Sequence, residues 1–191
     1  MDVSLAEIEI VENNSVCLLD EREVESMFTR LAEDITEKCS DMNPIVLCVM
    51  TGAVVAVGRL LPKLKFPLEM DYIHATRYQG KTVGEALVWK QLPTTTLLNR
   101  TVIIVDDVLD EGITMAKLKE YCVEQGAERC YTAVLVDKAM TENKPVTADF
   151  VGFQAGNDYL FGLGMDYKGY LRNVSGLYAC PENLEELLCQ C

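Results

Sequence analysis

Apolar and polar positions follow two different spacings along this chain. Over residues 20–39 apolar side chains recur every three or four positions, as in an amphipathic helix, and Asp20 with Glu23 resembles a helix-capping box. Residues 45–50 are a continuous apolar run, which predicts a buried strand, and an apolar helix follows at 53–61. The same patterns predict further strands at 68–76, 101–105, 130–136 and 150–153, and helices at 113–125 and from 181 onward.

This alternation of strands and helices predicts a parallel sheet with helices on both faces. No internal repeat and no Pro-, Gly- or Ser-rich linker divides the chain, and its 191 residues fit one domain. In open sheets of this kind, ligands bind beyond the carboxyl ends of the strands. The chemistry is therefore expected at residues 50–52, 106–114 and 137–138.

Composition narrows the function classes. Seventeen Lys and Arg against thirty Asp and Glu give a net charge of −13, and such a surface repels phosphate backbones and anionic lipid. We therefore expect neither nucleic-acid nor membrane binding. The apolar stretch at 45–61 is too short for a transmembrane helix, which needs about 20 residues. Eight cysteines without metal-ligand spacing and an acidic N-terminus predict a reduced, cytoplasmic protein.

Residues 102–114 contain most of the candidate ligand-binding residues. Apolar residues lead to two adjacent acids, Asp106 and Asp107, and a short loop then brings Gly112 and Thr114 to the start of a helix. N–H groups at a helix start form an anion cradle, and the paired acids suit ribose hydroxyls or a metal ion. A sugar phosphate fits better than a triphosphate, because the chain has neither G-x-x-x-x-G-K-[ST] nor G-x-G-x-x-G. The alternative is an acidic turn that only caps a helix.

The order of apolar run, paired acids, spaced acid, glycine and threonine resembles the phosphoribosyl-pyrophosphate (PRPP) motif of the type I phosphoribosyltransferases. The resemblance implies that family's α/β fold, a parallel twisted sheet flanked by helices. It implies a single domain with a core at about 40–155 and a small hood, from about 1–40 and 155–191, over the base. It further implies that PRPP phosphate and ribose bind Asp106, Asp107, Glu111, Gly112, Ile113 and Thr114.

Two later segments narrow the resemblance to the hypoxanthine-guanine phosphoribosyltransferases. Val136-Asp137-Lys138 resembles a strand end of that family, which implies that Lys138 hydrogen-bonds the 6-oxo group of the purine. Residues 149–153 and 159–167 resemble its purine-pocket segment. This implies that the base stacks on Tyr159, that the backbone of Leu160 contacts its edge, and that Asp166 belongs to the same pocket.

The pyrophosphate side departs from the family pattern. Arg172 matches an arginine associated with that side, but the first loop, often Leu-Lys-Gly in the family, is Met50-Thr51-Gly52 here. A cation is therefore missing beside Thr51 and Gly52, and we hypothesise that Arg77 supplies part of that charge. In the family the peptide bond entering the middle residue of this loop can be cis.

The reaction implied is displacement of pyrophosphate from C1 of PRPP by a purine ring nitrogen. The implied cofactor is Mg²⁺, held by Asp106, Asp107 and Asp166, which neutralises the leaving group. Asp110 is the candidate to accept or relay the purine proton. Its alternative role is a helix-start acid that favours the helix dipole by about 0.3–1 kcal/mol.

The two residues assigned to base binding could instead have purely structural roles. Lys138 at a strand end could be a solvated lysine paired with Asp137. Tyr159 could be an ordinary core aromatic beside Leu160 and Phe161.

Three functions compete at this point. The leading one is a purine-salvage enzyme that makes IMP and GMP from PRPP with hypoxanthine and guanine. A second is a sister enzyme that prefers xanthine, and a third is a PRPP-sensing regulator without turnover. The resemblance alone implies a homodimer or a homotetramer.

Overall fold

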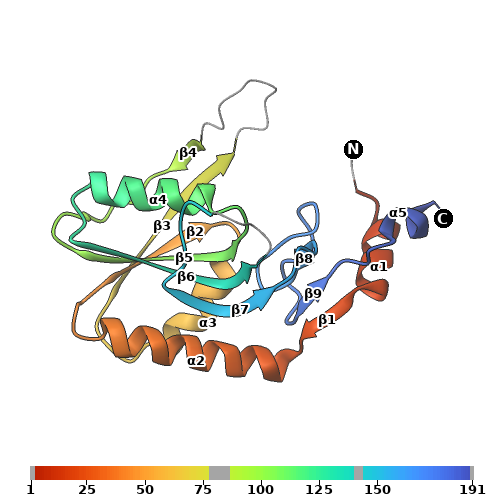
Figure 1. Cartoon of the computed structure of the whole chain (residues 1–191), viewed down its shortest axis with the longest axis horizontal. Helices are drawn as coiled ribbons and strands as arrows, with labels where there is room; N and C mark the ends of the chain where they lie inside the picture. Colours follow the sequence, from red (N-terminus) through yellow and green to blue (C-terminus); the bar gives the residue numbers. More distant parts are fainter. Residues whose placement is uncertain (1–2, 78–86, 140–143, 190–191) are drawn as a thin grey trace.

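The main body of the protein is a six-stranded sheet. The computed structural model describes residues 3–77, 87–139 and 144–189, and the sheet has the order β4-β3-β2-β5-β6-β7 (Figure 1). Only β3 and β4 pair antiparallel, at one edge. The predicted parallel sheet is confirmed, with one antiparallel edge strand added. Its strands are β2 (Ile45–Met50), β3 (Glu69–Arg77), β4 (Leu87–Gln91), β5 (Thr101–Leu109), β6 (Arg129–Lys138) and β7 (Phe150–Ala155).

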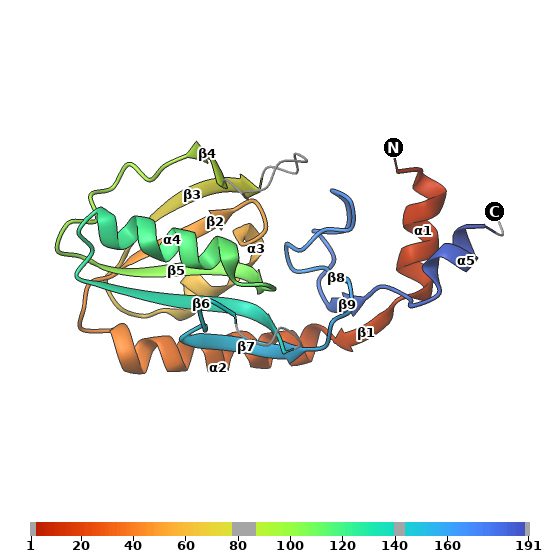
Figure 2. The same ribbon diagram turned by 45° about the horizontal axis from the view of Figure 1, so that its top comes forward.

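Helices cover both faces of this sheet, as predicted. α4 (Ile113–Glu124) lies on one face, and α2 (Glu21–Cys39) and α3 (Val54–Leu60) lie on the other (Figures 1 and 2). The capping box at the start of α2 is confirmed: Asp20 Oδ1 accepts from the Glu23 N–H at 2.8 Å, and Glu23 Oε2 accepts from the Asp20 N–H at 2.9 Å. At Pro62 the chain passes into a short 3₁₀ turn, η1 (Leu61–Lys63).

β5 is longer than the sequence pattern predicted. Residues 101–105 are buried, which explains their apolar run, but the strand continues to Leu109. Pairing with β6 persists through Val108↔Val136 and Leu109↔Asp137. The prediction that the strand ends before Asp106 is therefore wrong, because this ladder keeps the acidic residues extended.

The terminal segments form a second, three-stranded sheet of order β1-β9-β8. Its strands are β1 (Val16–Leu19), β8 (Leu160–Phe161) and β9 (Leu177–Ala179), and the helices α1 (Leu5–Asn14) and α5 (Leu184–Leu188) lie against each other at this end (Figure 1). The Tyr167 hydroxyl and the Lys168 ammonium both donate to Glu7 Oε1 at 2.7 Å. These contacts join α1 to the segment that follows β8.

The packing of α2 differs from the expected hood boundary near residue 40. Phe28, Leu31 and Ile35 of α2 are buried in the main core, and the helix packs against β7. The amphipathic face of α2 needs a sheet to cover it, so α2 belongs to the main body. In the described part of the chain, no helix combines the length and the hydropathy needed to cross a membrane.

Candidate active site

Two carboxylates lie side by side near the carboxyl end of β5. Asp106 Oδ1 accepts from the Asp107 N–H, and Asp107 Oδ1 accepts from the Val108 N–H, both at 2.9 Å. Burial raises the pKa of Asp106 well above its usual value, and the charge of Asp107 raises it further. Burial also raises the pKa of Asp107, although hydrogen bonds and the charge of Arg172 oppose that rise. A cation or a hydroxyl donor would relieve both carboxylates.

The donor chemistry of this pair fits Mg²⁺, which proteins bind through one or two carboxylates together with substrate phosphates. Asp166, the third predicted ligand, is held differently. Its Oδ1 lies 2.6 Å from Arg172 Nη2, and its Oδ2 accepts from the Gly169 N–H at 2.6 Å. Within residues 3–77, 87–139 and 144–189, no three His, Cys, Asp or Glu side chains form a metal-holding group. Asp166 therefore does not complete a three-carboxylate metal group with Asp106 and Asp107, because Arg172 and Gly169 engage it, although Asp166 and Asp107 line one pocket.

The loop between β5 and α4 surrounds a pocket of about 210 Å³. Gly112 caps α4 with a left-handed φ of 78°, and Ile113 is the first helical residue. Glu111 is exposed beside it. The lining residues are Asp106, Asp107, Val108, Leu109, Asp110, Gly112, Thr114 and Met115. Most of the predicted PRPP residues therefore surround one cavity.

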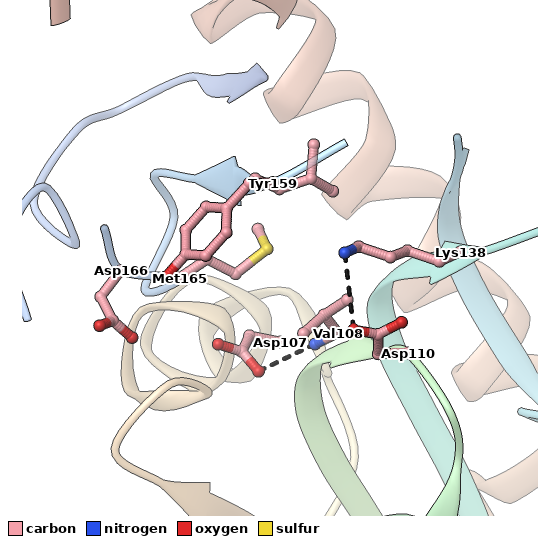
Figure 3. Close-up of a pocket in the computed structure, with 8 residues that line it drawn as sticks. Asp107, Val108, Asp110, Lys138, Tyr159, Met165 and Asp166 are labelled. Carbon is pink, nitrogen blue, oxygen red and sulfur yellow. Dashed lines mark hydrogen bonds and ion pairs between the residues drawn. The ribbon is translucent and has the colours of Figure 1, made fainter. Parts of the chain in front are cut away.

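A second pocket of about 260 Å³ shares Asp107, Val108 and Asp110 with the first. Figure 3 shows Lys138 and Asp110 on one side of it and Tyr159, Met165 and Asp166 on the other. These residues, with Asp107, Val108 and Leu160, line it. The two pockets therefore meet at the end of β5.

The purely structural roles considered above for Lys138 and Tyr159 are wrong. Lys138 is only 12% exposed, and its Nζ lies 3.6 Å from Asp110 Oδ2. Asp137 pairs instead with Lys144, at 2.5 Å. Tyr159 is 52% exposed, too open for a core aromatic, and its ring meets that of Tyr167 edge-on with centroids 5.7 Å apart.

The first loop meets the acids of β5 at close range. The Met50–Thr51 peptide bond is cis. A Cβ on Gly52 would lie 2.0 Å from Asp107 Oδ2, and a Cβ on Gly164 would lie 2.0 Å from the Gly52 carbonyl oxygen. The first loop therefore contacts both β5 and the segment after β8, and glycine is required at positions 52 and 164 because a Cβ would not fit there.

The cations predicted for the pyrophosphate side have different outcomes. Arg172 is about a third exposed, and besides its pair with Asp166 its Nη1 donates to the Gly164 carbonyl at 2.6 Å. The side chain of Arg77 lies outside the described residues; its backbone pairs with Leu87.

Sequence reasoning missed Val108 and Met165 of the pocket wall, and Lys144. Val108 and Met165 are apolar residues within predicted segments, so only the three-dimensional pocket identifies them. Lys144 follows no motif.

Comparisons with known proteins agree with this geometry. Residues 17–168 match the family described as "Phosphoribosyl transferase domain". The hypoxanthine-guanine-xanthine phosphoribosyltransferase of Tritrichomonas foetus is 31% identical over 172 residues, which cover 89% of this chain and 93% of that protein. The hypoxanthine-guanine phosphoribosyltransferase of Bacillus subtilis (strain 168) is 30% identical over 159 residues, covering 82% and 88%.

Solved structures give the same result. One described as a hypoxanthine-guanine-xanthine phosphoribosyltransferase superposes with a TM-score of 0.81 at 28% identity, covering 89% of this chain and 99% of that chain. A hypoxanthine phosphoribosyltransferase from Staphylococcus aureus superposes with a TM-score of 0.85 at 18% identity, covering 92% and 96%, and supports the fold alone. The expected type I fold is confirmed, and this chain belongs to the phosphoribosyl transferase domain family.

Proposed function

We propose that this chain transfers the 5-phosphoribosyl group of PRPP to hypoxanthine or guanine, giving IMP or GMP and pyrophosphate. The observation that carries the proposal is the junction of two pockets at Asp110, one beside the β5–α4 loop and one between Lys138 and Tyr159. The relatives from T. foetus and B. subtilis are named for hypoxanthine and guanine. A phosphoribosyl group and a purine in these pockets would meet at their shared wall.

In the proposed reaction, the bond from C1 to the pyrophosphate oxygen breaks and a bond from C1 to a purine ring nitrogen forms. The transition state resembles an oxocarbenium ion, as in glycoside chemistry. Asp110 accepts or relays the proton that the ring nitrogen loses. Its place in both pockets supports this role, because it faces the donor and the acceptor of the transfer.

PRPP is held from the β5 side. Asp106 and Asp107 accept hydrogen bonds from the ribose hydroxyls, and the N–H groups of residues 111–114, with the Thr114 hydroxyl, hold the 5′-phosphate. Asp106 and Asp107 would hold Mg²⁺ together with PRPP, and the ion would supply positive charge for the leaving pyrophosphate. The raised pKa of both acids supports this assignment, since a nearby cation favours the ionised form of a carboxyl group.

The base is recognised from the β6 side. A lysine ammonium donates hydrogen bonds but cannot accept them. Lys138 therefore selects a 6-oxo group over the 6-amino group of adenine. The half-exposed ring of Tyr159 stacks on the purine, and the backbone of Leu160 contacts its edge.

Pyrophosphate is placed beside Thr51, Gly52, Arg77 and Arg172. The existing pair of Arg172 with Asp166 supports a further source of positive charge here, which we assign to Arg77. Arg77→Ala is expected to raise the KM for PRPP several-fold, and an unchanged KM and turnover would overturn the assignment.

Xanthine is a second candidate base, since the T. foetus relative is also named for it. A homodimer or homotetramer is proposed as the assembly. The exposed apolar surface of Val54, Met70 and Tyr72 supports it, and light scattering tests it. The reduced, cytoplasmic setting is supported by the free thiols of the described cysteines.

The deciding experiment assays the purified chain with PRPP, Mg²⁺ and, in turn, hypoxanthine, guanine, xanthine and adenine. Nucleotide formation from hypoxanthine and guanine but not adenine is the expected result, and turnover of xanthine would add the third base. PRPP binding without turnover of any base would overturn the proposal in favour of a regulator.

A further inference from the structure

Lys144 is a nearly buried lysine that the proposed reaction does not use. It lies just before β7, and only 10% of its side chain is exposed. Its Nζ donates to the Leu109 carbonyl oxygen at 2.8 Å and to Asp137 Oδ1 at 2.5 Å. Leu109 and Asp137 are register partners near the carboxyl ends of β5 and β6. Lys144 therefore bridges these strands at the edge where both pockets open.

The two residues that Lys144 holds are the chain neighbours of the two that form the ion pair in the pocket. Leu109 precedes Asp110, and Asp137 precedes Lys138. Successive residues of a strand point to opposite faces. Asp137 thus faces Lys144, while Lys138 faces the pocket and lies 3.6 Å from Asp110 (Figure 3).

The charge of Asp137 is balanced away from the pocket. Its Oδ1 contacts Lys144, and its Oδ2 accepts from Gln154 Nε2 at 3.2 Å. Because both oxygens are engaged, Asp137 does not compete with Asp110 for the Lys138 ammonium. Loss of the Lys144 charge would leave a largely buried carboxylate next to Lys138, and such a group is costly without its cation.

The segment that carries Lys144 also forms a wall of the PRPP loop. A Cβ on Gly112 would lie 3.4 Å from Pro145 Cδ and Val146 Cγ1, and 3.5 Å from Lys144 Cβ. The side chains of this segment and the loop glycine are therefore packed together. Lys144 connects that wall to the strand ends through its ammonium.

The geometry points to Lys144 as a positioning residue for the proposed transfer. By tying the Leu109 carbonyl to Asp137, it sets the separation of Asp110 from Lys138 and so the recognition of the base. It acts through these neighbours rather than on the substrate. The inference rests on the proposed function and adds a specificity-determining residue to it.

The test compares Lys144→Met, which keeps an apolar stem but removes the charge and the donors, with Lys144→Arg, which keeps both. We expect Lys144→Met to raise the KM for hypoxanthine and guanine about 10-fold to 100-fold and to weaken the rejection of adenine, with a smaller change in the KM for PRPP. Lys144→Arg should recover most of this loss. The control is Lys117→Met, since Lys117 is 55% exposed and pairs only on the surface with Glu120 in the contacts described.

Two results with folded Lys144→Met would overturn the inference. One is an unchanged KM and discrimination for the bases. The other is an equal fall in kcat for every base without a change in KM, which reports general loss of active protein. If Lys144→Met does not fold, Asp137→Asn keeps an oxygen for Lys144 and should shift the base KM in the same direction; an unchanged KM there also overturns it. Absence of turnover by the unaltered chain would instead overturn the proposed function.

Discussion

The site joins two acidic regions whose carboxylates differ in how their charge is balanced. At the end of β5, Asp106 and Asp107 stand side by side, and burial raises the pKa of both. In the segment after β8, Asp166 is neutralised by Arg172 at 2.6 Å and accepts from the backbone of Gly169. A cation or hydroxyl donors from a ligand would stabilise the carboxylates of the first region. The Asp166 carboxylate of the second region already has its partners within the protein.

This contrast distinguishes residues that bind a ligand from residues that hold a loop in its conformation. Strained backbone and charged groups without a partner concentrate at functional sites, where a bound ligand can stabilise them. A satisfied ion pair instead fixes a loop in one conformation. Substitutions at the ends of β5 and β6 should therefore change the reaction more than the fold. Substitutions of the glycines in residues 162–172 should change the fold first.

The largest expected effect is that of Asp110→Asn. Removal of a proton acceptor typically lowers the rate by 10²–10⁴-fold, and the same loss is expected in kcat. Because the Asp110 side chain is 50% exposed, the thermal midpoint should change little. Steady-state kinetics and a thermal melt check both parts, with Asp34→Asn on the exposed face of α2 as the control. Full turnover by Asp110→Asn would remove its catalytic role.

Lys138→Met tests the opposite wall of the same pocket. It keeps the apolar stem but removes the only donor assigned to the 6-oxo group. We expect about a 100-fold loss of kcat/KM for guanine relative to adenine, because a pocket built around a hydrogen bond discriminates through it. Competition between the two bases measures that ratio. A variant that still rejects adenine and keeps its affinity for guanine would refute the role of Lys138.

Gly164→Ala tests the second region. The new Cβ would lie 2.0 Å from the Gly52 carbonyl oxygen, and the φ of 105° already disfavours a side chain. We expect a loss of about 3 kcal/mol in the free energy of unfolding, with activity falling alongside it. The matched control is Gly169→Ala, which has a φ of 93° but nothing within 4 Å of its Cβ. That control should lose only about 1 kcal/mol.

A denaturant titration of the two glycine variants measures this difference directly. Equal losses would mean that the positive φ alone sets the cost. The close approach of residues 162–165 to the first loop would then not matter for the fold.

The two regions also differ in how far the sequence predicted them. The β5–α4 site depends on consecutive residues, so spacing alone placed Asp106, Asp110 and Gly112 around one pocket. The small sheet depends on pairings across most of the chain, since Ala179 pairs with both Val16 and Leu160. Strands of two to four residues leave almost no periodic pattern.

The partners of individual charged side chains were equally hidden in the sequence. The pair of Asp137 with Lys144 and the engagement of Asp166 by Arg172 follow from how strand ends and loops pack. Adjacency in the chain pointed to the wrong partner for Lys138. Motif spacing therefore predicts which residues gather at a site better than it predicts which of them pair.

The last expected effect is a pH dependence of stability that arises from the buried Asp106 carboxyl group. The pKa of Asp106 is raised in the fold above its ordinary value of 3.8, so the folded chain holds this proton more tightly than the unfolded chain does. As pH rises from about 4 through the raised pKa, ionisation therefore costs stability, by no more than about 1.4 kcal/mol per pH unit. Asp106→Asn mimics the protonated acid and avoids this cost.

The unliganded Asp106→Asn variant should therefore match the unaltered chain near pH 4 and become the more stable of the two as pH rises. Thermal melts between pH 4.5 and 8 measure the difference, while PRPP binding by the variant should weaken. The control is Asp34→Asn, on the exposed face of α2. A constant difference across this range would mean that Asp106 is already balanced within the fold, and the contrast with Asp166 would then disappear.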